Sequence, residues 1–115
     1  MLGKGVGWVF TIRVDPADDD KVEGLLGEIF NAMEKEEFPT GGVITYTAYR
    51  DPNEPGKWVM FEHFTEEGSD RHAKGPLVRD PGSRLMKLLV APRERMQLEP
   101  VFLRGCGEPI VTDGT

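Results

Sequence analysis

Residues 58–76, WVMFEHFTEEGSDRHAKGP, combine an apolar strand pattern with a polar helix pattern. Glu62 interrupts the apolar run, although charged side chains are rarely buried without a partner. A strand that carries a carboxylate among aromatic residues usually directs it at a pocket or at a partner. Thr65 opens the helical pattern, His72 lies within it, and Gly75-Pro76 ends it. The stretch therefore predicts a strand followed by a helix. Glu62 in the strand and His72 in the helix are the candidate functional residues of this stretch.

The most regular pattern in the chain is an amphipathic helix that precedes this stretch. Its apolar residues recur at intervals that place them on one helical face. They are Val22, Leu25, Leu26, Ile29, Phe30 and Met33. Asp15 is a suitable cap for this helix, with Pro16 at its first position. The stripe stops before the acidic residues 34–37, and Pro39 with Gly41-Gly42 provides the exit.

Alternating patterns predict four strands around the helical segments. The predicted strands are residues 6–14, 43–50, 58–64 and 96–103, and a polar hairpin loop spans 51–56. The second helical region should be interrupted at Gly75-Pro76 and again at Pro81-Gly82, after which Leu85, Leu88 and Leu89 resume helical spacing. The order strand, helix, strand, strand, helix, strand predicts an α+β, ferredoxin-like βαββαβ fold with an antiparallel sheet and both helices on one face.

The second face of this sheet also needs cover. The second strand is mostly apolar on both sides. Its residues alternate between Val43, Thr45, Thr47 and Tyr49 on one side and Ile44, Tyr46 and Ala48 on the other. Trp8 or its neighbours on the first strand add to the apolar surface. The simplest cover is the sheet of a second copy, which predicts a homodimer.

Size, charge and cysteine content limit the possible classes of protein. The 115 residues fit a single domain, 1–115, with a core over about 6–103 and a C-terminal tail over 104–115. With 20 acidic against 14 basic residues, the net charge of −6 disfavours nucleic acid and anionic membranes as partners. Cys106 is the single cysteine, and no segment approaches the roughly 20 apolar residues of a membrane span. We expect a soluble, cytoplasmic protein.

The step from Glu62 to Phe64 at the end of the third strand, with His72 on the next helix, resembles the antibiotic biosynthesis monooxygenase family. In that family the helix histidine is followed by a small residue and a proline, here Gly75-Pro76, and the resemblance covers about residues 6–103. It implies a dimeric α/β barrel in which two sheets pack together. Haem-degrading relatives carry an asparagine on the first strand, and GWVFTIRV has none, which argues against haem.

The resemblance also implies an activity. It points to a small monooxygenase that oxidises an activated polycyclic phenol or a similar aromatic with molecular oxygen, without metal, flavin or haem. An electron-rich phenolate can itself reduce dioxygen, so the protein need only bind, deprotonate and desolvate its substrate.

Two residues are candidates for catalysis under this resemblance. An apolar setting should raise the pKa of Glu62 and make it a proton acceptor; alternatively, it pairs with a lysine or arginine or caps the next helix. His72 should line the cleft between sheet and helices and move a proton; alternatively, it faces solvent beside Asp70 and Arg71. His63 should point to the opposite strand face, toward the dimer interface.

Aromatic residues supply the candidate substrate-binding groups, which are Trp58, Phe61, Phe64 and Tyr46. Such residues are more often part of a core, but some must line any cavity that the fold leaves open. We expect a small aromatic or apolar ligand and no metal or other cofactor, since no His-x-x-x-His or paired cysteine spacing is present. The glycines at positions 3, 5 and 7 precede a strand, so they do not form a phosphate-binding loop.

The alternative function is a non-catalytic dimeric small-ligand-binding or regulatory module of the same fold, because a fold by itself does not establish chemistry. An enclosed cavity lined by His72, Glu62 and aromatic residues would favour an enzyme. A cleft filled by side chains would favour the module.

Overall fold

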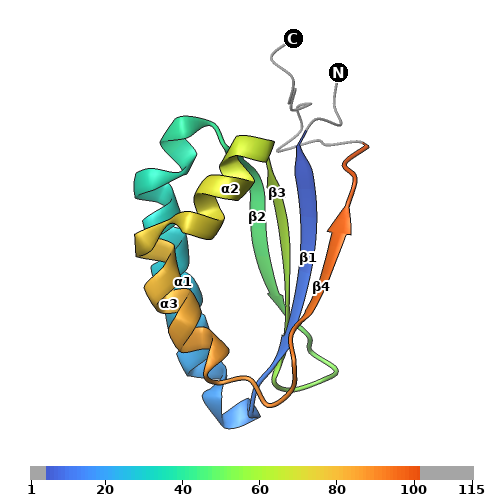
Figure 1. Cartoon of the computed structure of the whole chain (residues 1–115). Coiled ribbons are helices and arrows are strands. Elements are labelled where there is room, and N and C mark those ends of the chain that lie inside the picture. The colour runs from blue at the N-terminus through green and yellow to red at the C-terminus, as the bar shows by residue number, and fades with distance from the viewer. Residues whose placement is uncertain (1–4, 102–115) are drawn as a thin grey trace.

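The chain forms a four-stranded antiparallel sheet with its helices on one face (Figure 1). The structure is a computed structural model that describes residues 5–101, apart from the side chain of residue 77. The strands are β1 (Val6–Arg13), β2 (Val43–Arg50), β3 (Lys57–Phe64) and β4 (Glu94–Leu98), in the spatial order β2-β3-β1-β4. The helices are α1 (Asp19–Glu36), α2 (Glu66–Lys74) and α3 (Pro76–Met86). This is the predicted ferredoxin-like arrangement. No helix in the described part of the chain is long and apolar enough to cross a membrane.

The long helix α1 forms where the apolar stripe predicted it. Asp15 caps a 3₁₀ turn, Pro16–Asp18, and its Oδ1 accepts a hydrogen bond from the Ala17 amide at 2.9 Å. The buried face consists of Val22, Leu25, Leu26, Ile29, Ala32 and Met33. Phe30 is half-buried beside it and packs edge-to-face on Tyr46, with the ring centroids 4.8 Å apart. Burial of this apolar face orders the helix against the sheet.

The second helical region divides into α2 and α3 at the predicted point. Gly75 is extended (φ −67°, ψ 121°), as expected for a residue before proline, and Pro76 opens α3. The predicted second break at Pro81-Gly82 is wrong, because α3 continues through Pro81, which is buried in the helix that packs along α1. That packing compensates for the one backbone hydrogen bond that a proline removes. The helix ends before Leu88 and Leu89, which pack half-buried against the core from a loop and do not continue the predicted spacing.

Two strands depart from the predicted pattern. In β2, a register shift between Val43 and Thr45 turns Val43 into the core on the same side as Tyr46, because a β-bulge inserts one residue into the alternation. The last strand begins two residues before the predicted start, where Glu94 pairs with Thr11, and it ends at Leu98 instead of residue 103. Residues 102 and 103, the tail 104–115 and its cysteine lie outside the described residues.

The sheet face away from the helices carries exposed apolar side chains. Tyr49, Phe61, Met96 and Leu98 are 56, 45, 57 and 44% exposed, and the strand pairings place them on this face. Trp8 or its neighbours were predicted to contribute here; Trp8 itself faces the helices, and its Nε1 donates to Ser69 Oγ at 3.4 Å. Its neighbour Val9 does lie on the outward face, opposite Phe61. In the described part of the chain, no helix covers this face (Figure 1).

Candidate functional site

A cavity of about 440 Å³ lies between the helix-facing side of the sheet and helices α2 and α3. The polar or aromatic residues that line it are Phe10, Tyr46, Glu62, His72, Arg79, Ser83, Arg93 and Arg95. Apolar residues such as Met60, Leu26 and Ile29 make up most of the remaining wall. An apolar pocket with a few convergent polar groups is the usual form of a small-molecule site.

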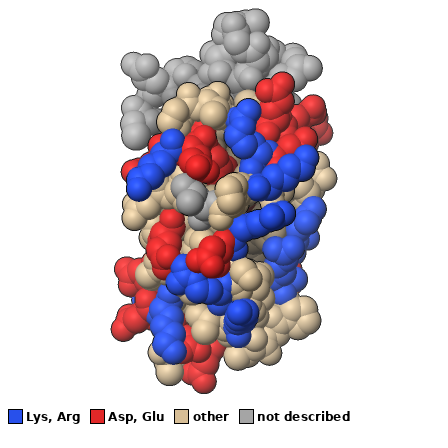
Figure 2. Space-filling model, turned by 60° about the vertical axis from the view of Figure 1, so that its left-hand side comes forward, with Lys and Arg blue, Asp and Glu red and all other residues tan. Residues whose placement is uncertain are grey.

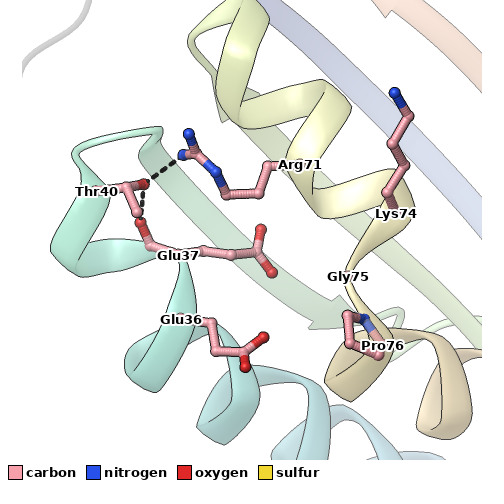
Figure 3. A pocket seen from close by; sticks show the side chains of 7 residues that line it. All are labelled: Glu36, Glu37, Thr40, Arg71, Lys74, Gly75 and Pro76. Carbon is pink, nitrogen blue, oxygen red and sulfur yellow. Dashed lines mark hydrogen bonds between the residues drawn. The ribbon is translucent and has the colours of Figure 1, made fainter.

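A second hollow, of about 560 Å³, opens beside the C-terminal end of α2 (Figure 3). It is lined by Glu36, Glu37, Thr40, Arg71, Lys74, Gly75 and Pro76, most of which are exposed. The Arg71 guanidinium donates to Thr40 Oγ1 at 2.8 Å across it. Because apolar side chains line much more of the smaller cavity than of this hollow, we place the candidate site in the smaller cavity. Glu37 lines this hollow, and its carboxylate contacts His72, which lines the smaller cavity.

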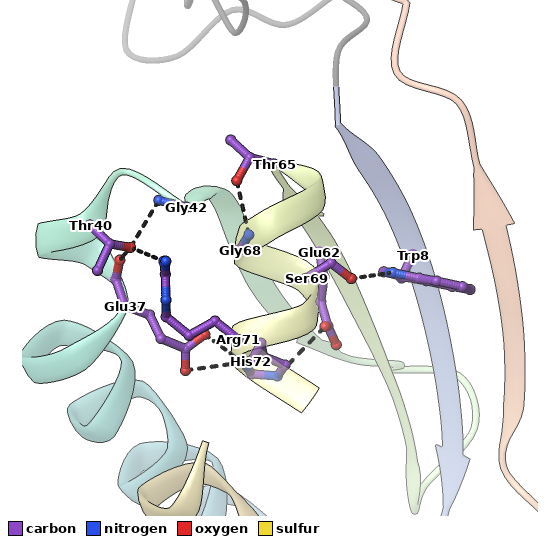
Figure 4. A network of polar contacts seen from close by, with 10 residues as sticks. All are labelled: Trp8, Glu37, Thr40, Gly42, Glu62, Thr65, Gly68, Ser69, Arg71 and His72. Atoms are coloured by element: carbon purple, nitrogen blue, oxygen red, sulfur yellow. Dashed lines mark hydrogen bonds and ion pairs between the residues drawn. The ribbon is translucent and has the colours of Figure 1, made fainter. Parts of the chain in front are cut away.

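His72 lines the smaller cavity and contacts carboxyl groups from two other elements, Glu62 in the same wall and Glu37 behind it (Figure 4). Oε1 and Oε2 of Glu37 lie 2.8 and 3.2 Å from Nδ1 of His72, and Nε2 of the same ring lies 4.0 Å from Oε1 of Glu62. Glu37 and Glu62 are buried, at 3 and 7% exposure. A carboxylate only accepts hydrogen bonds, so Nδ1 carries a proton and donates it to Glu37. In the neutral ring, Nε2 is then the basic nitrogen.

The surroundings of Glu62 keep it protonated at neutral pH. Burial raises the pKa of this carboxyl group to about 8, and the nearby carboxylate of Glu37 contributes to the increase. Arg93 and a hydrogen bond from the Tyr46 hydroxyl act in the opposite direction on that pKa, with smaller effects. Burial, together with the charges of Glu62 and Glu37, also raises the pKa of Tyr46, so its phenol keeps its proton. The raised pKa of Glu62 has the direction that its apolar strand predicted.

The structure also decides between the alternatives for the polar residues of 58–76. Thr65, and not Glu62, caps α2, and within the described residues Glu62 forms no ion pair with a lysine or arginine. The side chain of His72 is 17% exposed and turns inward toward Glu37 instead of facing solvent. His63 lies on the outward sheet face, as alternation predicted. Among residues 5–101, no group of three or more His, Cys, Asp or Glu side chains is placed to hold a metal ion.

Close backbone packing at Gly68 sets the position of His72. Thr65 caps α2 by accepting a hydrogen bond from the Gly68 amide at 3.0 Å, and its own amide donates to the Gly42 carbonyl at 2.9 Å. A Cβ atom at Gly68 would lie 2.1 Å from the same carbonyl oxygen. The missing side chain lets α2 touch the loop that follows Glu37. His72, one helical turn after Gly68, therefore reaches the Glu37 carboxylate.

Replacing Gly68 by Ala is expected to destabilise the fold by about 2 kcal/mol, because the backbone must move to admit the methyl group. Gly27 in α1 is the matched control, since nothing lies within 4 Å of a Cβ built there. Helix propensity predicts that Gly27→Ala stabilises the protein by about 0.5–1 kcal/mol. Urea unfolding measures both changes, and wild-type stability for Gly68→Ala would contradict the close packing.

Three of the six residues predicted for the site, His72, Glu62 and Tyr46, line the cavity. The other three do not. Phe64 is buried and supports the His72 ring, with the centroids 4.9 Å apart. Trp58 is buried elsewhere in the core, where its Nε1 donates to a carboxylate at the start of α1 at 2.9 Å. Phe61 lies on the outward sheet face, because neighbouring strand residues point in opposite directions.

The sequence prediction missed Glu37, Arg93 and Arg95. Glu37 follows Met33 by four residues and so continues the buried stripe of α1, which is the signal that identifies it. Arg93 and Arg95 are two residues apart in an extended segment and so share one face. Which face they share depends on the register of β4 against β1, where Arg95 pairs with Phe10.

Comparisons with known proteins identify the fold. No known family profile matches the sequence, and no curated protein matches it. A protein from Caulobacter crescentus, described as a "putative antibiotic biosynthesis monooxygenase", has a TM-score of 0.77 at 18% identity, over 86% of this chain and 92% of that chain. A protein of the same description from Chloroflexus aurantiacus has a TM-score of 0.71 at 23% identity, over 89% of this chain and 98% of that chain. A conserved protein from Methanosarcina mazei has a TM-score of 0.73 at 21% identity, over 83 and 91% of the two chains. The chain therefore has the fold of proteins described as antibiotic biosynthesis monooxygenases, as its resemblance in sequence implied.

Proposed function

We propose that the protein is a cofactor-independent monooxygenase that acts on a phenol- or quinol-type aromatic substrate. The observation that carries this proposal is the cavity in which the basic Nε2 of His72 and the protonated Glu62 meet an apolar wall. The likeness in fold to proteins described as antibiotic biosynthesis monooxygenases supports the class of reaction. The cavity is lined by His72, Glu62 and aromatic residues and is not filled by side chains, which supports an enzyme over a module whose cleft is filled.

The cavity suits the ring system of a flat aromatic molecule. Its volume of about 440 Å³ lies within the usual range for small-molecule sites. Phe10, Met60 and Tyr46 provide apolar contact surface on the sheet side. A substrate that fills this space excludes water, which strengthens the electrostatic interactions at the polar wall.

The first chemical step is removal of the phenol proton. Nε2 of His72 accepts it, and the carboxylate of Glu37 stabilises the resulting imidazolium through the hydrogen bond from Nδ1. Glu62 is protonated below about pH 8 and donates a hydrogen bond to the phenolate oxygen. The Tyr46 hydroxyl holds Glu62 in place by donating to it. The site thus holds an electron-rich phenolate beside the His72 imidazolium that carries its proton.

The phenolate then reduces molecular oxygen. Where the oxidised position is an activated ring CH₂ group, its carbon forms a bond to one oxygen atom, loses both hydrogens and becomes C=O. The second oxygen atom leaves as water with those two hydrogens. The substrate supplies all the electrons, so the balance needs no external reductant.

An oxygen electrode tests this proposal. Purified protein in air-saturated buffer receives hydroxylated naphthalenes, anthrones and quinols one at a time. Oxygen uptake above the uncatalysed rate is expected with at least one of them, and His72→Ala protein is the control for uptake that does not use the site. Binding of these compounds without any oxygen uptake would favour the non-catalytic small-ligand-binding or regulatory module.

We also propose that two copies associate through their outward sheet faces. The exposed side chains of Tyr49, Phe61, Met96 and Leu98 form an apolar surface on that side. Exposed apolar surfaces of this kind often mark protein interfaces. A second sheet packed on this face gives a symmetric homodimer in which each copy covers the other.

The substitution Phe61→Lys is expected to convert this dimer into a monomer, because the interface would bury a charge without a partner. Phe38→Lys is the matched control, since Phe38 is 39% exposed but lies in the 3₁₀ turn Phe38–Thr40, outside the sheet. Light scattering at micromolar concentration should give twice the mass of one chain for wild type and for Phe38→Lys. A monomeric wild-type protein would contradict the proposed assembly.

A further inference from the structure

Three arginines gather at the cavity, although the protein as a whole is acidic. Arg79 of α3, Arg93 just before β4 and Arg95 within β4 line it, whereas the net charge of the chain is −6. In the view of Figure 2, Lys and Arg side chains form a band along one side of the molecule. A local concentration of positive charge on an acidic protein attracts anions to that place.

These three guanidinium groups remain available to a ligand. Within residues 5–101, none of them forms an ion pair with a carboxylate, whereas Arg13 and Arg84 each pair with two. All three side chains are exposed at the surface. The donors of Arg79, Arg93 and Arg95 are therefore not already used by carboxylates of the described chain.

Aromatic rings hold two of these arginines in place. The guanidinium carbon of Arg93 lies 5.5 Å from the centroid of the Phe10 ring, and that of Arg95 lies 4.2 Å from the Trp8 ring. A cation–π contact of this kind positions a guanidinium over a ring and uses none of its N–H groups as hydrogen-bond donors to another acceptor. Phe10 also lines the cavity, so the Arg93 guanidinium and the apolar wall share one surface.

Arg95 of β4 and the His72–Glu62 pair lie on different sides of the cavity, while Arg93 lies close enough to Glu62 to lower its pKa. In the sheet, β1 separates β3, which carries Glu62, from β4. Two strand spacings amount to about 10 Å, which is close to the length of a two-ring aromatic molecule. A ligand of that length, with a hydroxyl group at one end and an anion at the other, can contact both sets of polar groups.

We propose that the cavity binds an aromatic hydroxy acid. Its ring system fills the apolar part, its hydroxyl group faces His72, and its carboxylate binds Arg93 and Arg95 with Arg79 on the opposite wall. The inference that such an acid is the substrate depends on the proposed oxidation. The inference that the cavity binds it does not depend on that oxidation.

Calorimetric titration at pH 6 with three probes tests this inference. The first probe, 6-hydroxy-2-naphthoate, carries its hydroxyl and carboxylate at opposite ends; 2-naphthol lacks the carboxylate, and 3-hydroxy-2-naphthoate carries the two groups side by side. At this pH the carboxylates are ionised, and Glu62, with a pKa of about 8, stays protonated. The first probe should bind about tenfold more tightly than either of the others, as expected for charge-assisted hydrogen bonds at one end only.

Variants locate the effect. Arg93→Gln and Arg95→Gln should each weaken binding of 6-hydroxy-2-naphthoate about tenfold and leave binding of 2-naphthol unchanged. Arg50→Gln is the matched control, because Arg50 is also exposed and lies 5.2 Å from the centroid of the Trp58 ring but does not line the cavity. It should change neither affinity.

Equal affinity for the first two probes, no binding of the acid, or an equal loss in Arg50→Gln would overturn the inference. Failure of the proposed oxidation gives a different result. In that case the preference for 6-hydroxy-2-naphthoate and its dependence on Arg93 and Arg95 remain, while no probe causes oxygen uptake. Oxygen uptake with neutral naphthols and no preference for the acid would support the oxidation and overturn the inference alone.

Discussion

Glu62→Gln protein is expected to lose much less stability than wild type when the pH rises from 6 to 9. Burial raises the folded-state pKa of Glu62 to about 8, above its ordinary value of 4.5. At a pH between these two pKa values, the folded protein keeps the Glu62 proton, whereas the unfolded chain has released it. The free energy of unfolding therefore falls as the pH rises. Linkage gives a loss of about 3 kcal/mol between pH 6 and 9 from this one group. Glutamine keeps the shape and a hydrogen-bond acceptor for Tyr46 but cannot ionise.

Urea unfolding of both proteins at pH 6, 7, 8 and 9 measures the difference. Glu23→Gln is the control, since Glu23 is an exposed acid on α1 and its removal changes the net charge equally. The Glu23→Gln protein should follow the wild-type pH profile. Parallel profiles for wild type and Glu62→Gln would show that Glu62 ionises at an ordinary pH and would remove its assigned role as a hydrogen-bond donor at neutral pH.

The substitution His72→Ala is expected to lower turnover of an accepted phenol by about 100-fold, which is a usual contribution of a positioned general base. The same change leaves Glu37 buried without its hydrogen-bond donor, so it should also destabilise the fold by about 1–3 kcal/mol. Turnover and urea unfolding are therefore measured together. Lys74→Ala, at an exposed position on the same helix, is the control for effects on α2.

The variant Glu37→Gln separates catalysis from folding. The glutamine amide oxygen can still accept the hydrogen bond from Nδ1 of His72, but the charge that stabilises the imidazolium is gone. Turnover should fall about tenfold with stability close to wild type. In the double variant with His72→Ala, stability should return toward wild type while turnover stays low. Full turnover in His72→Ala would exclude the histidine as the base.

Local patterns were enough to predict most of the secondary structure. The buried face of α1 is a periodic property of a short segment, and so is its cap at Asp15. The hairpin between β2 and β3 follows from two strand patterns and the polar loop between them. Where the prediction was wrong, a contact from elsewhere in the chain outweighed the local preference. Pro81 stays within α3 because the helix packs along α1, and Val43 faces the core because a bulge shifts its register.

By itself, the sequence determined the order of elements, the buried stripe of α1, and the presence of a carboxylate and a histidine near one cavity wall. It identified Glu62 and His72 because each stands out against its own neighbours. Tertiary structure alone decided that Glu37 contacts His72 across 35 residues of chain, and that Arg93 and Arg95 face the cavity instead of the outward side. The physical reason is that a local pattern specifies the face a residue shares with its neighbours, whereas the partner of that face depends on how helices dock on the sheet and on the register of β4 against β1.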